Sequence, residues 1–264
     1  MKSIKIISMD FDGSLLSSDK IVTDRTRKCL TNFKKKSYII IGITARNLLS
    51  VKATLDVNLF DYIILNNGSD IYYVEENKIE NVGIIDIETA QKIVDLCEDS
   101  SCEIDFCTSY NYLIKSKVKG DNRSFVRYID GIDDIDYSIS RMNVFFRDVK
   151  KVEEYKLLIE KSFDNLDVVK MLDTDKLNSR IWLTINPKNI NKFSTLKRMC
   201  DNLKCSIGEV IFFGDSENDL VLIENAGIGV AMENALDIVK EKASYVTLSN
   251  DNDGIAEYLE NNFE

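Results

Sequence analysis

The stretch Ser8-Met9-Asp10-Phe11-Asp12-Gly13-Ser14 decides the fold. It follows the apolar run Ile4-Lys5-Ile6-Ile7, which predicts a buried β-strand. Two aspartates stand where this strand ends, and a glycine then permits a tight turn. Ligands of open parallel α/β sheets bind beyond the carboxyl ends of the strands, so the two carboxylates predict a nucleophile and an acid/base that share a metal. The alternative is a solvated aspartate turn after an edge strand.

Composition limits the possible partners. The chain has 264 residues, 44% hydrophobic and 30% charged, which suits one large domain or a core with a smaller inserted domain. The formal net charge is −10 and no long basic run is present, which argues against a nucleic-acid partner. An anionic small substrate would need locally placed cations or a metal to offset this charge.

The absence of histidine excludes several kinds of site. Ser-His-Asp and Cys-His catalysis and histidine-based zinc sites are ruled out, so acid/base chemistry falls to carboxylates, Lys, Tyr, Cys or metal-bound water. The six cysteines form no C-x-x-C pair, which favours ordinary thiols in a reducing cytosol. The N-terminus shows no apolar segment long enough for a signal peptide or a membrane span. We therefore expect a cytoplasmic protein without a membrane partner.

Alternating apolar strands and amphipathic helices predict a parallel sheet in two parts of the chain. The first part has strands at 4–7, 38–43 and 62–65, a helix at 23–36 and a helix of roughly ten residues from 47. The second part has helices at 191–202, 220–226 and 254–260 and strands at 209–213, 227–232 and 244–248. These patterns predict a discontinuous α/β core formed by residues 1–81 and 187–264.

The segment between these parts, residues 82–186, predicts an inserted α+β domain of common size. Its expected helices lie at 86–97, 123–129 and 152–161. Its expected strands lie at 102–106 and 112–114, which form a hairpin, and at 142–146, 167–171 and 180–185. Asn186-Pro187 is the expected return hinge.

Four polar clusters lie at strand ends, or just before a helix, of the predicted core. They are Asp10/Asp12, Thr44, Lys192 and Asp215/Asn218/Asp219. Together they supply an anionic metal pocket, a hydroxyl, a lysine and an amide, which are the parts of a phosphoryl-transfer site. Mg²⁺ prefers such oxygen ligands, and a carboxylate can attack phosphorus.

Each cluster also has a simpler explanation. Thr44 could cap the following helix, Lys192 could be a solvated helix residue, and Asp219 could only cap its own helix.

The four clusters, in this order, resemble the motifs of the haloacid dehalogenase superfamily, and the insertion resembles the cap of its Cof-type subclass, IIB. The resemblance implies a Rossmann-like parallel-sheet core with an inserted cap domain that closes over the site and selects the leaving group. It implies that Asp10 is the nucleophile and that Asp12 is the acid/base. Thr44, Lys192 and Asn218 would bind phosphate, and Asp10, Asp12, Asp215 and Asp219 would hold Mg²⁺, Asp12 through its backbone carbonyl and Asp219 indirectly.

The resulting hypothesis is a Mg²⁺-dependent phosphatase of small phosphorylated metabolites, such as sugar phosphates or phosphorylated cofactors, that acts through an aspartyl phosphate. We expect a monomer or a small homo-oligomer. A phosphomutase or phosphotransferase on the same core, and a non-catalytic metabolite-binding regulatory protein, are the alternatives. Ala45 and Phe193 replace the glycines usual in the family, which affects loop geometry more than chemistry.

Overall fold

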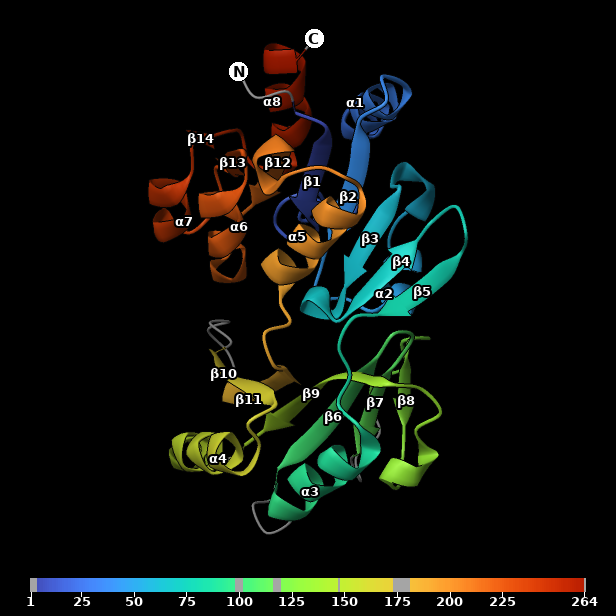
Figure 1. The fold of residues 1–264 in the computed structure, drawn as a ribbon, viewed down its shortest axis with the longest axis vertical. Helices are drawn as coiled ribbons and strands as arrows, with labels where there is room; N and C mark the ends of the chain where they lie inside the picture. Colours follow the sequence, from blue (N-terminus) through green and yellow to red (C-terminus); the bar gives the residue numbers. More distant parts are fainter. Residues whose placement is uncertain (1–3, 98–101, 116–119, 147, 173–180, 264) are drawn as a thin grey trace. The chain divides into compact units, whose positions relative to one another are not determined.

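A computed structural model describes residues 4–97, 102–115, 120–146, 148–172 and 181–263 (Figure 1). The chain divides into two compact units. Unit 1 consists of residues 1–45, 51–80 and 191–264, and unit 2 consists of residues 46–50 and 81–190. The sequence places the domain boundaries near residues 82 and 186. In the structure, the chain passes from unit 1 to unit 2 between residues 80 and 81 and returns to unit 1 between residues 190 and 191. Residues 46–50 also belong to unit 2.

Unit 1 is built on one mixed sheet. Its strands are β1 (Ile6–Asp10), β2 (Ile39–Ile43), β3 (Tyr62–Leu65), β4 (Asp70–Tyr73), β5 (Lys78–Asn81), β12 (Val210–Gly214), β13 (Ile228–Ala231) and β14 (Tyr245–Val246). The order across the sheet is β14-β13-β12-β1-β2-β3-β4-β5. The pairs from β14 to β3 are parallel, and β3 pairs antiparallel with β4. The predicted α/β fold with a parallel sheet is confirmed.

The helices of this part of the chain are α1 (Asp24–Lys35), α2 (Leu48–Lys52), α5 (Lys192–Asn202), α6 (Leu220–Asn225), α7 (Asp237–Lys242) and α8 (Gly254–Phe263). Residues 48–50 of α2 belong to unit 2. Thr23 caps α1, because its side chain accepts a hydrogen bond from the Thr26 amide. Leu30 and Phe33 of α1 are buried. On α5, Leu196 is buried and Phe193 is half-buried.

β1 lies in the middle of the sheet, and its apolar side chains Ile6, Ile7 and Met9 are suited to burial there. It pairs in parallel with β12 on one side and with β2 on the other, and Asp10 lies opposite Ile43. All five residues of β1 are buried. Each fully buried large aliphatic side chain contributes about 1.5–3 kcal/mol of hydrophobic stabilisation. This packing fixes the carboxyl ends of β1, β2 and β12 at one edge.

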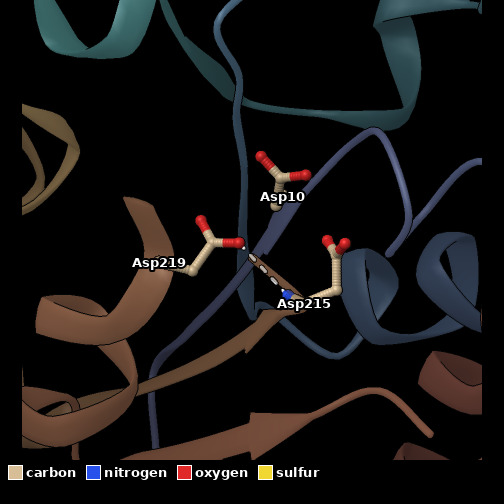
Figure 2. Close-up of side chains that lie close together, drawn as sticks. All are labelled: Asp10, Asp215 and Asp219. Atoms are coloured by element: carbon tan, nitrogen blue, oxygen red, sulfur yellow. Dashed lines mark hydrogen bonds between the residues drawn. The ribbon is translucent and has the colours of Figure 1, made fainter. Parts of the chain in front are cut away.

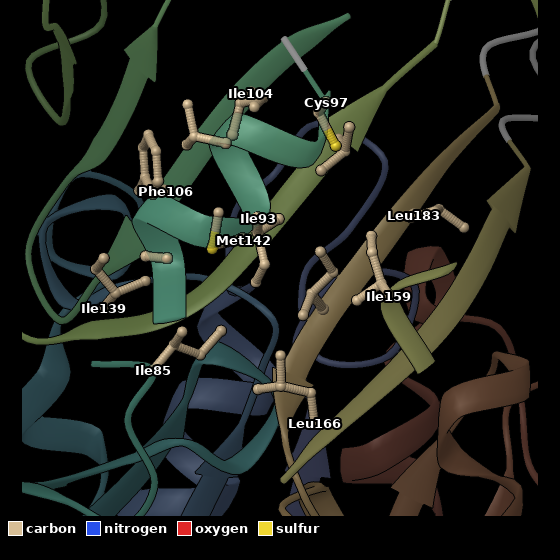
Figure 3. Packing of buried hydrophobic residues seen from close by; sticks show 14 of the residues in the cluster. Ile85, Ile93, Cys97, Ile104, Phe106, Ile139, Met142, Ile159, Leu166 and Leu183 are labelled. Atoms are coloured by element: carbon tan, nitrogen blue, oxygen red, sulfur yellow. The ribbon is translucent and has the colours of Figure 1, made fainter. Parts of the chain in front are cut away.

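Unit 2 has a six-stranded sheet in the order β10-β11-β9-β6-β7-β8. Its elements are α3 (Ile87–Cys97), β6 (Glu103–Thr108), β7 (Tyr112–Lys115), β8 (Val126–Tyr128), β9 (Ile139–Phe145), α4 (Val149–Ser162), β10 (Leu166–Leu172) and β11 (Ile181–Pro187). Figure 3 shows its apolar core, in which Ile93 of α3 and Ile159 of α4 pack with Phe106, Met142 and Leu183 of the strands. Both helices therefore pack on one face of this sheet.

The predicted helix at 123–129 is wrong. Val126–Tyr128 forms β8, which pairs in parallel with β7. The Tyr112 amide also donates to the Phe125 carbonyl at 2.8 Å, so the sheet satisfies the backbone of this segment. β-branched and aromatic residues fit this extended environment better than a helix.

The helix after residue 47 is shorter than expected. α2 ends at Lys52, and Asp56 then caps a short 3-10 helix, Val57–Leu59, by accepting from the Asn58 amide. The strands β4 and β5 and the helix α7 are absent from the sequence-based assignment, because elements of four to six residues carry little periodicity. Within the described parts of the chain, no helix has the length and apolar character needed to span a bilayer.

Candidate active site

Asp10 and Asp215 lie side by side because β1 and β12 are adjacent. Met9 pairs with Phe213, so the aspartate that ends β1 and the one that follows β12 reach the same edge of the sheet. Asp219 joins them from the 3-10 helix Glu217–Asp219. Figure 2 shows the three side chains, each of which offers an oxygen within 4.8 Å of the others. Asp10 and Asp219 are buried, and Asp215 is half-buried.

Lys192 supplies the positive charge of this cluster. Its ammonium donates to Asp10 Oδ1 at 2.6 Å, to Asp219 Oδ1 at 2.7 Å and to Asn218 Oδ1 at 3.2 Å. The side chain is buried, so the alternative of a solvated surface lysine is wrong. Asn191 fixes the start of α5 with a capping box to Ser194, which places Lys192 at the first helical position.

The charges of the cluster do not balance, because three carboxylates face one ammonium. Burial, followed by the repulsion of Asp219 and Asp215, raises the pKa of Asp10 well above its usual range against the attraction of Lys192. Burial and then Asp219 raise the pKa of Asp215 to about 6, although Ser14 and Lys192 oppose the shift. Burial acts to lower the pKa of Lys192, but Asp10 and Asp219 outweigh it, so the net shift is upward. A cation at this site would relieve the excess negative charge.

Both oxygens of Asp219 are already engaged by the protein. Oδ1 accepts from Lys192, and Oδ2 accepts from the Asp215 and Ser216 amides at 3.1 and 3.2 Å and from Ser216 Oγ at 3.1 Å. Asp219 thus caps its 3-10 helix, but it also binds Lys192, so a capping role alone is ruled out. These bonds favour an indirect contribution to metal binding over direct ligation.

Thr44 is placed next to Asp10 by the strand register. It follows Ile43, which lies opposite Asp10, and it is buried. Its amide donates to the Ile64 carbonyl at 2.9 Å and its carbonyl accepts from the Asn67 amide at 3.0 Å. The cap of α2 is instead Asn47, whose Oδ1 accepts from the Ser50 amide at 2.9 Å, which contradicts the helix-cap alternative for Thr44.

Asp12 stands apart from the buried cluster. Its side chain is 42% exposed, and Oδ1 lies 2.9 Å from the ammonium of Lys20. Asp12 therefore has access to water, as a group that exchanges protons requires. The sequence identified Asp12 but not its lysine neighbour.

Several residues that shape the site were assigned no contact from the sequence. Ser14 Oγ donates to Asp215 Oδ1 at 3.0 Å. Gly13 has a φ of +87°, and a Cβ there would lie 2.3 Å from Asp215 Oδ2. Asn234 Nδ2 donates to the Gly13 carbonyl at 2.7 Å and so fixes this loop. Gly13 and Ser14 belong to the first motif stretch, but its spacing does not reveal these contacts.

A second loop connects the phosphate-binding candidates. Gly68 has a φ of +115°, and a Cβ there would lie 2.4 Å from the Asn191 carbonyl oxygen. Thr195 Oγ1 donates to the Gly68 carbonyl at 2.7 Å. Since Asn67 also binds the backbone of Thr44, this loop ties Thr44 to the start of α5.

The donor set fits a hard divalent cation. Asp10 and Asp215 offer carboxylate oxygens, and their raised pKa values reflect negative charge that Mg²⁺ would stabilise. No cysteine belongs to the cluster that the described residues form, and the chain has no histidine, so softer metals are not favoured.

Residues 7–259 match the family profile described as haloacid dehalogenase-like hydrolase. The chain belongs to this family. Membership confirms the recognition made from the four motifs and identifies the protein as a hydrolase.

Relatives of this haloacid dehalogenase-like hydrolase agree with that assignment. A 5-amino-6-(5-phospho-D-ribitylamino)uracil phosphatase of Bacillus subtilis is 26% identical and covers 97% of this chain and 94% of its own length. The solved structure of a haloacid dehalogenase-like hydrolase from Bacteroides thetaiotaomicron has a TM-score of 0.84, 24% identity and coverage of 99% and 100%. A subclass IIB sugar phosphatase of known structure has a TM-score of 0.76, 21% identity and coverage of 97% and 98%. The two solved structures support the fold.

Proposed function

We propose that this hydrolase is a Mg²⁺-dependent phosphatase that acts on small phosphorylated metabolites, such as sugar phosphates or phosphorylated cofactors. The observation that carries the proposal is the position of the Lys192 ammonium, 2.6 Å from Asp10 and 2.7 Å from Asp219, at the edge where β1 and β12 end. A buried cation beside a buried carboxylate can hold a phosphoryl group against its nucleophile.

In the proposed reaction, a carboxylate oxygen of Asp10 attacks phosphorus while the bond to the leaving oxygen breaks. Asp12 gives its proton to that oxygen, and the product alcohol departs. Asp12 then takes a proton from water, whose oxygen attacks the aspartyl phosphate, and inorganic phosphate and the free Asp10 carboxylate are formed. Lys192, Thr44 and Asn218 bind the phosphate oxygens throughout.

Mg²⁺ would be held by the carboxylates of Asp10 and Asp215 and by the backbone carbonyl of Asp12, with Asp219 acting through its neighbours. When bound, it would neutralise charge on the carboxylates and the phosphate. Ser14 holds the Asp215 carboxylate from the side of the β1 loop. Asp219 orients both Lys192 and the backbone that follows β12.

The names of relatives support the substrate class. The Bacillus subtilis relative is a phosphatase of a phosphorylated ribitylamino-uracil, and one solved neighbour is a sugar phosphatase. We propose that residues 82–186 act as the cap that selects the leaving group. The cytoplasmic location and the monomeric or small homo-oligomeric state stay predictions.

The test is release of inorganic phosphate from a panel of phosphomonoesters, with Mg²⁺ and with EDTA. We expect metal-dependent release by the wild type, none by Asp10→Asn, and unchanged release by Asp19→Asn, an exposed carboxylate in the following loop. Full activity of Asp10→Asn would refute the proposed nucleophile. Transfer of the phosphoryl group to an alcohol would indicate a transferase or mutase, and Mg²⁺ binding without any turnover would indicate a binding protein.

A further inference from the structure

The loop between β1 and α1, residues 11–23, brings a lysine onto the proposed acid/base. The ammonium of Lys20 donates to Asp12 Oδ1 at 2.9 Å, and both residues belong to unit 1. Their side chains are 56% and 42% exposed, and an ion pair at such a surface contributes little to the free energy of unfolding. What the pair fixes is the orientation of the Asp12 carboxylate.

Lys20 has a backbone conformation that costs free energy for a lysine. Its φ is +61°, in the left-handed region that glycine adopts most readily. The turn imposes this conformation, because the Lys20 amide donates to the Ser17 carbonyl at 2.9 Å and the Ser17 amide donates to the Ile21 carbonyl at 3.0 Å. A glycine would suit the position better, and the lysine side chain that stands there instead is bound to Asp12.

A second loop holds the tip of this turn. It consists of the 3-10 helix Asn250–Asn252 and Asp253, and we refer to it as the 250–253 loop. Asp251 accepts from both the amide and the hydroxyl of Ser18, each at 2.7 Å. These bonds lower the pKa of Asp251, so its carboxylate is charged and both bonds are strengthened by that charge. Ser18 lies only two residues before Lys20.

The 250–253 loop also binds the chain on both sides of the turn. Before the turn, Asn250 Nδ2 donates to the Leu16 carbonyl at 2.8 Å. After the turn, Asp253 Oδ1 accepts from Thr23 Oγ1 and, at 3.1 Å, from Thr26 Oγ1. The turn is therefore held at its tip and at both ends by one loop, about 230 residues away in the sequence.

The position of the lysine matches the charge that develops on a general acid. When Asp12 gives its proton to the leaving oxygen, the ammonium of Lys20 stabilises the carboxylate that forms. Since Lys20 binds Oδ1, proton transfer falls to Oδ2, and the same bond fixes the plane of the carboxylate. General acid catalysis depends on such placement, because the proton must face the oxygen that receives it.

We propose that Lys20 is a positioning residue that orients the Asp12 carboxylate for proton transfer to the leaving oxygen, and that the 250–253 loop holds Lys20 in place through Ser18. This inference rests on the proposed phosphatase function. It predicts an effect that depends on the leaving group. An alkyl phosphate needs protonation of its leaving oxygen, whereas 4-nitrophenyl phosphate releases an oxygen that is stable as an anion.

Four variants separate this role from a structural one. Lys20→Gly removes the ammonium and relieves the backbone, so the midpoint of urea unfolding should stay within error or rise. Lys20→Arg keeps a cation that can bind Asp12. Lys204→Gly is the matched control, because Lys204 is exposed and has a similar φ of +54° after α5. Asp251→Asn removes the charge to which Ser18 donates.

The measurement is kcat/KM for the alkyl phosphate that the wild type hydrolyses best and for 4-nitrophenyl phosphate. This quantity covers the steps up to departure of the leaving group, in which Asp12 acts as the acid. In Lys20→Gly we expect a loss of at least about tenfold for the alkyl ester and of less than about twofold for the nitrophenyl ester. Lys20→Arg should retain most of the alkyl-ester activity, and Lys204→Gly should keep both values.

The 250–253 loop is tested by Asp251→Asn, alone and combined with Lys20→Gly. The single variant should lose about threefold in kcat/KM for the alkyl ester and little for the nitrophenyl ester. The double variant should lose no more than Lys20→Gly alone, because both residues act on Asp12 by one route. A loss equal to the product of the two single losses would overturn the role of this loop.

An equal loss for both esters in Lys20→Gly would assign Lys20 to substrate binding or loop structure and would overturn the inference. Unchanged values for both esters would overturn it as well. Failure of the proposed function has a different signature, because it is seen in the wild type. A wild type that hydrolyses no alkyl phosphate would refute the proposed function, and this inference would fall with it.

Discussion

Lys192 donates a 2.6 Å hydrogen bond to Asp10, although the two residues are 182 positions apart in the sequence. Lys192 also binds Asp219 at 2.7 Å, and all three side chains are buried. The Lys192 ammonium thus joins the Asp10 carboxylate of the N-terminal part of unit 1 to the Asp219 carboxylate of its C-terminal part. Its removal tests both the stability and the chemistry of the site.

We expect Lys192→Met to destabilise the protein by about 3–5 kcal/mol, because two buried carboxylates lose their counter-charge. Phosphatase activity should fall on the order of 10²–10³-fold or more. The free energy of unfolding is measured by urea titration. Lys197→Met, at an exposed position of the same helix, is the control and should leave both quantities within error. Equal stability of the two variants would show that the buried ion pairs do not hold the site together.

Gly13→Ala should displace Asp215. The Cβ would lie 2.3 Å from Asp215 Oδ2, and the positive φ of residue 13 disfavours any side chain. We expect a loss of about 1–3 kcal/mol in the free energy of unfolding, together with weaker Mg²⁺ binding. The measurements are urea titration and calorimetry. At Gly131 a Cβ would have no described atom within 4 Å, so Gly131→Ala should change neither property.

Mg²⁺ should stabilise the folded protein, because it reduces repulsion among Asp10, Asp215 and Asp219. A concentration of 100 Kd would add about 2.7 kcal/mol, which raises the Tm by several degrees. Thermal unfolding is followed with Mg²⁺ and with EDTA. Asp215→Asn should remove most of the shift, whereas Asp19→Asn should retain it. A wild-type Tm that does not respond to Mg²⁺ would contradict a metal site at this cluster.

Asp105 should make unfolding depend on pH. Burial raises its pKa to about 6, against the hydrogen bond from Asn143 and the charge of Arg141. The folded protein therefore binds this proton more tightly than the unfolded chain does. The resulting stabilisation is complete below about pH 4 and is lost as the pH rises to about 6, by no more than about 3 kcal/mol.

The contribution of Asp105 is isolated by comparison with Asp105→Asn. The difference between the two unfolding free energies should change by roughly 1–3 kcal/mol between pH 4 and pH 7, with the wild type losing stability relative to the variant. Parallel stability curves would show that Asp105 titrates normally in the folded protein.

The sequence was most informative where long apolar patterns meet strong local signals. The strand that precedes Asp10, the helix capped by Thr23 and the helix that begins at Lys192 are all observed. Asp10, Asp215, Asn218 and Asp219 come together because the adjacent parallel strands β1 and β12 end at one edge, and Lys192 joins them from the start of α5. This consequence of topology can be derived before any coordinates are known.

Local sequence patterns could not reveal the contacts between residues that lie far apart in the sequence. The segment around Val126 has no helix-breaking residue, and only its pairing with β7 makes it a strand. The bonds from Ser14 to Asp215 and from Asn234 to Gly13 join loops that are more than 200 residues apart. The four bonds of Asp219 likewise depend on tertiary structure, so the sequence identified the residue but not its positioning role.

The central place of β1 also bears on how the protein is made. β1 leaves the ribosome well before its neighbour β12, which follows about 200 residues later, after the whole of unit 2. Until then, one edge of a buried, apolar strand has no partner and is open to pairing with other chains. We expect nascent chains that end before residue 210 to depend on chaperones, because Asp10 meets its acidic neighbours only after β12 and the residues that follow it have been made.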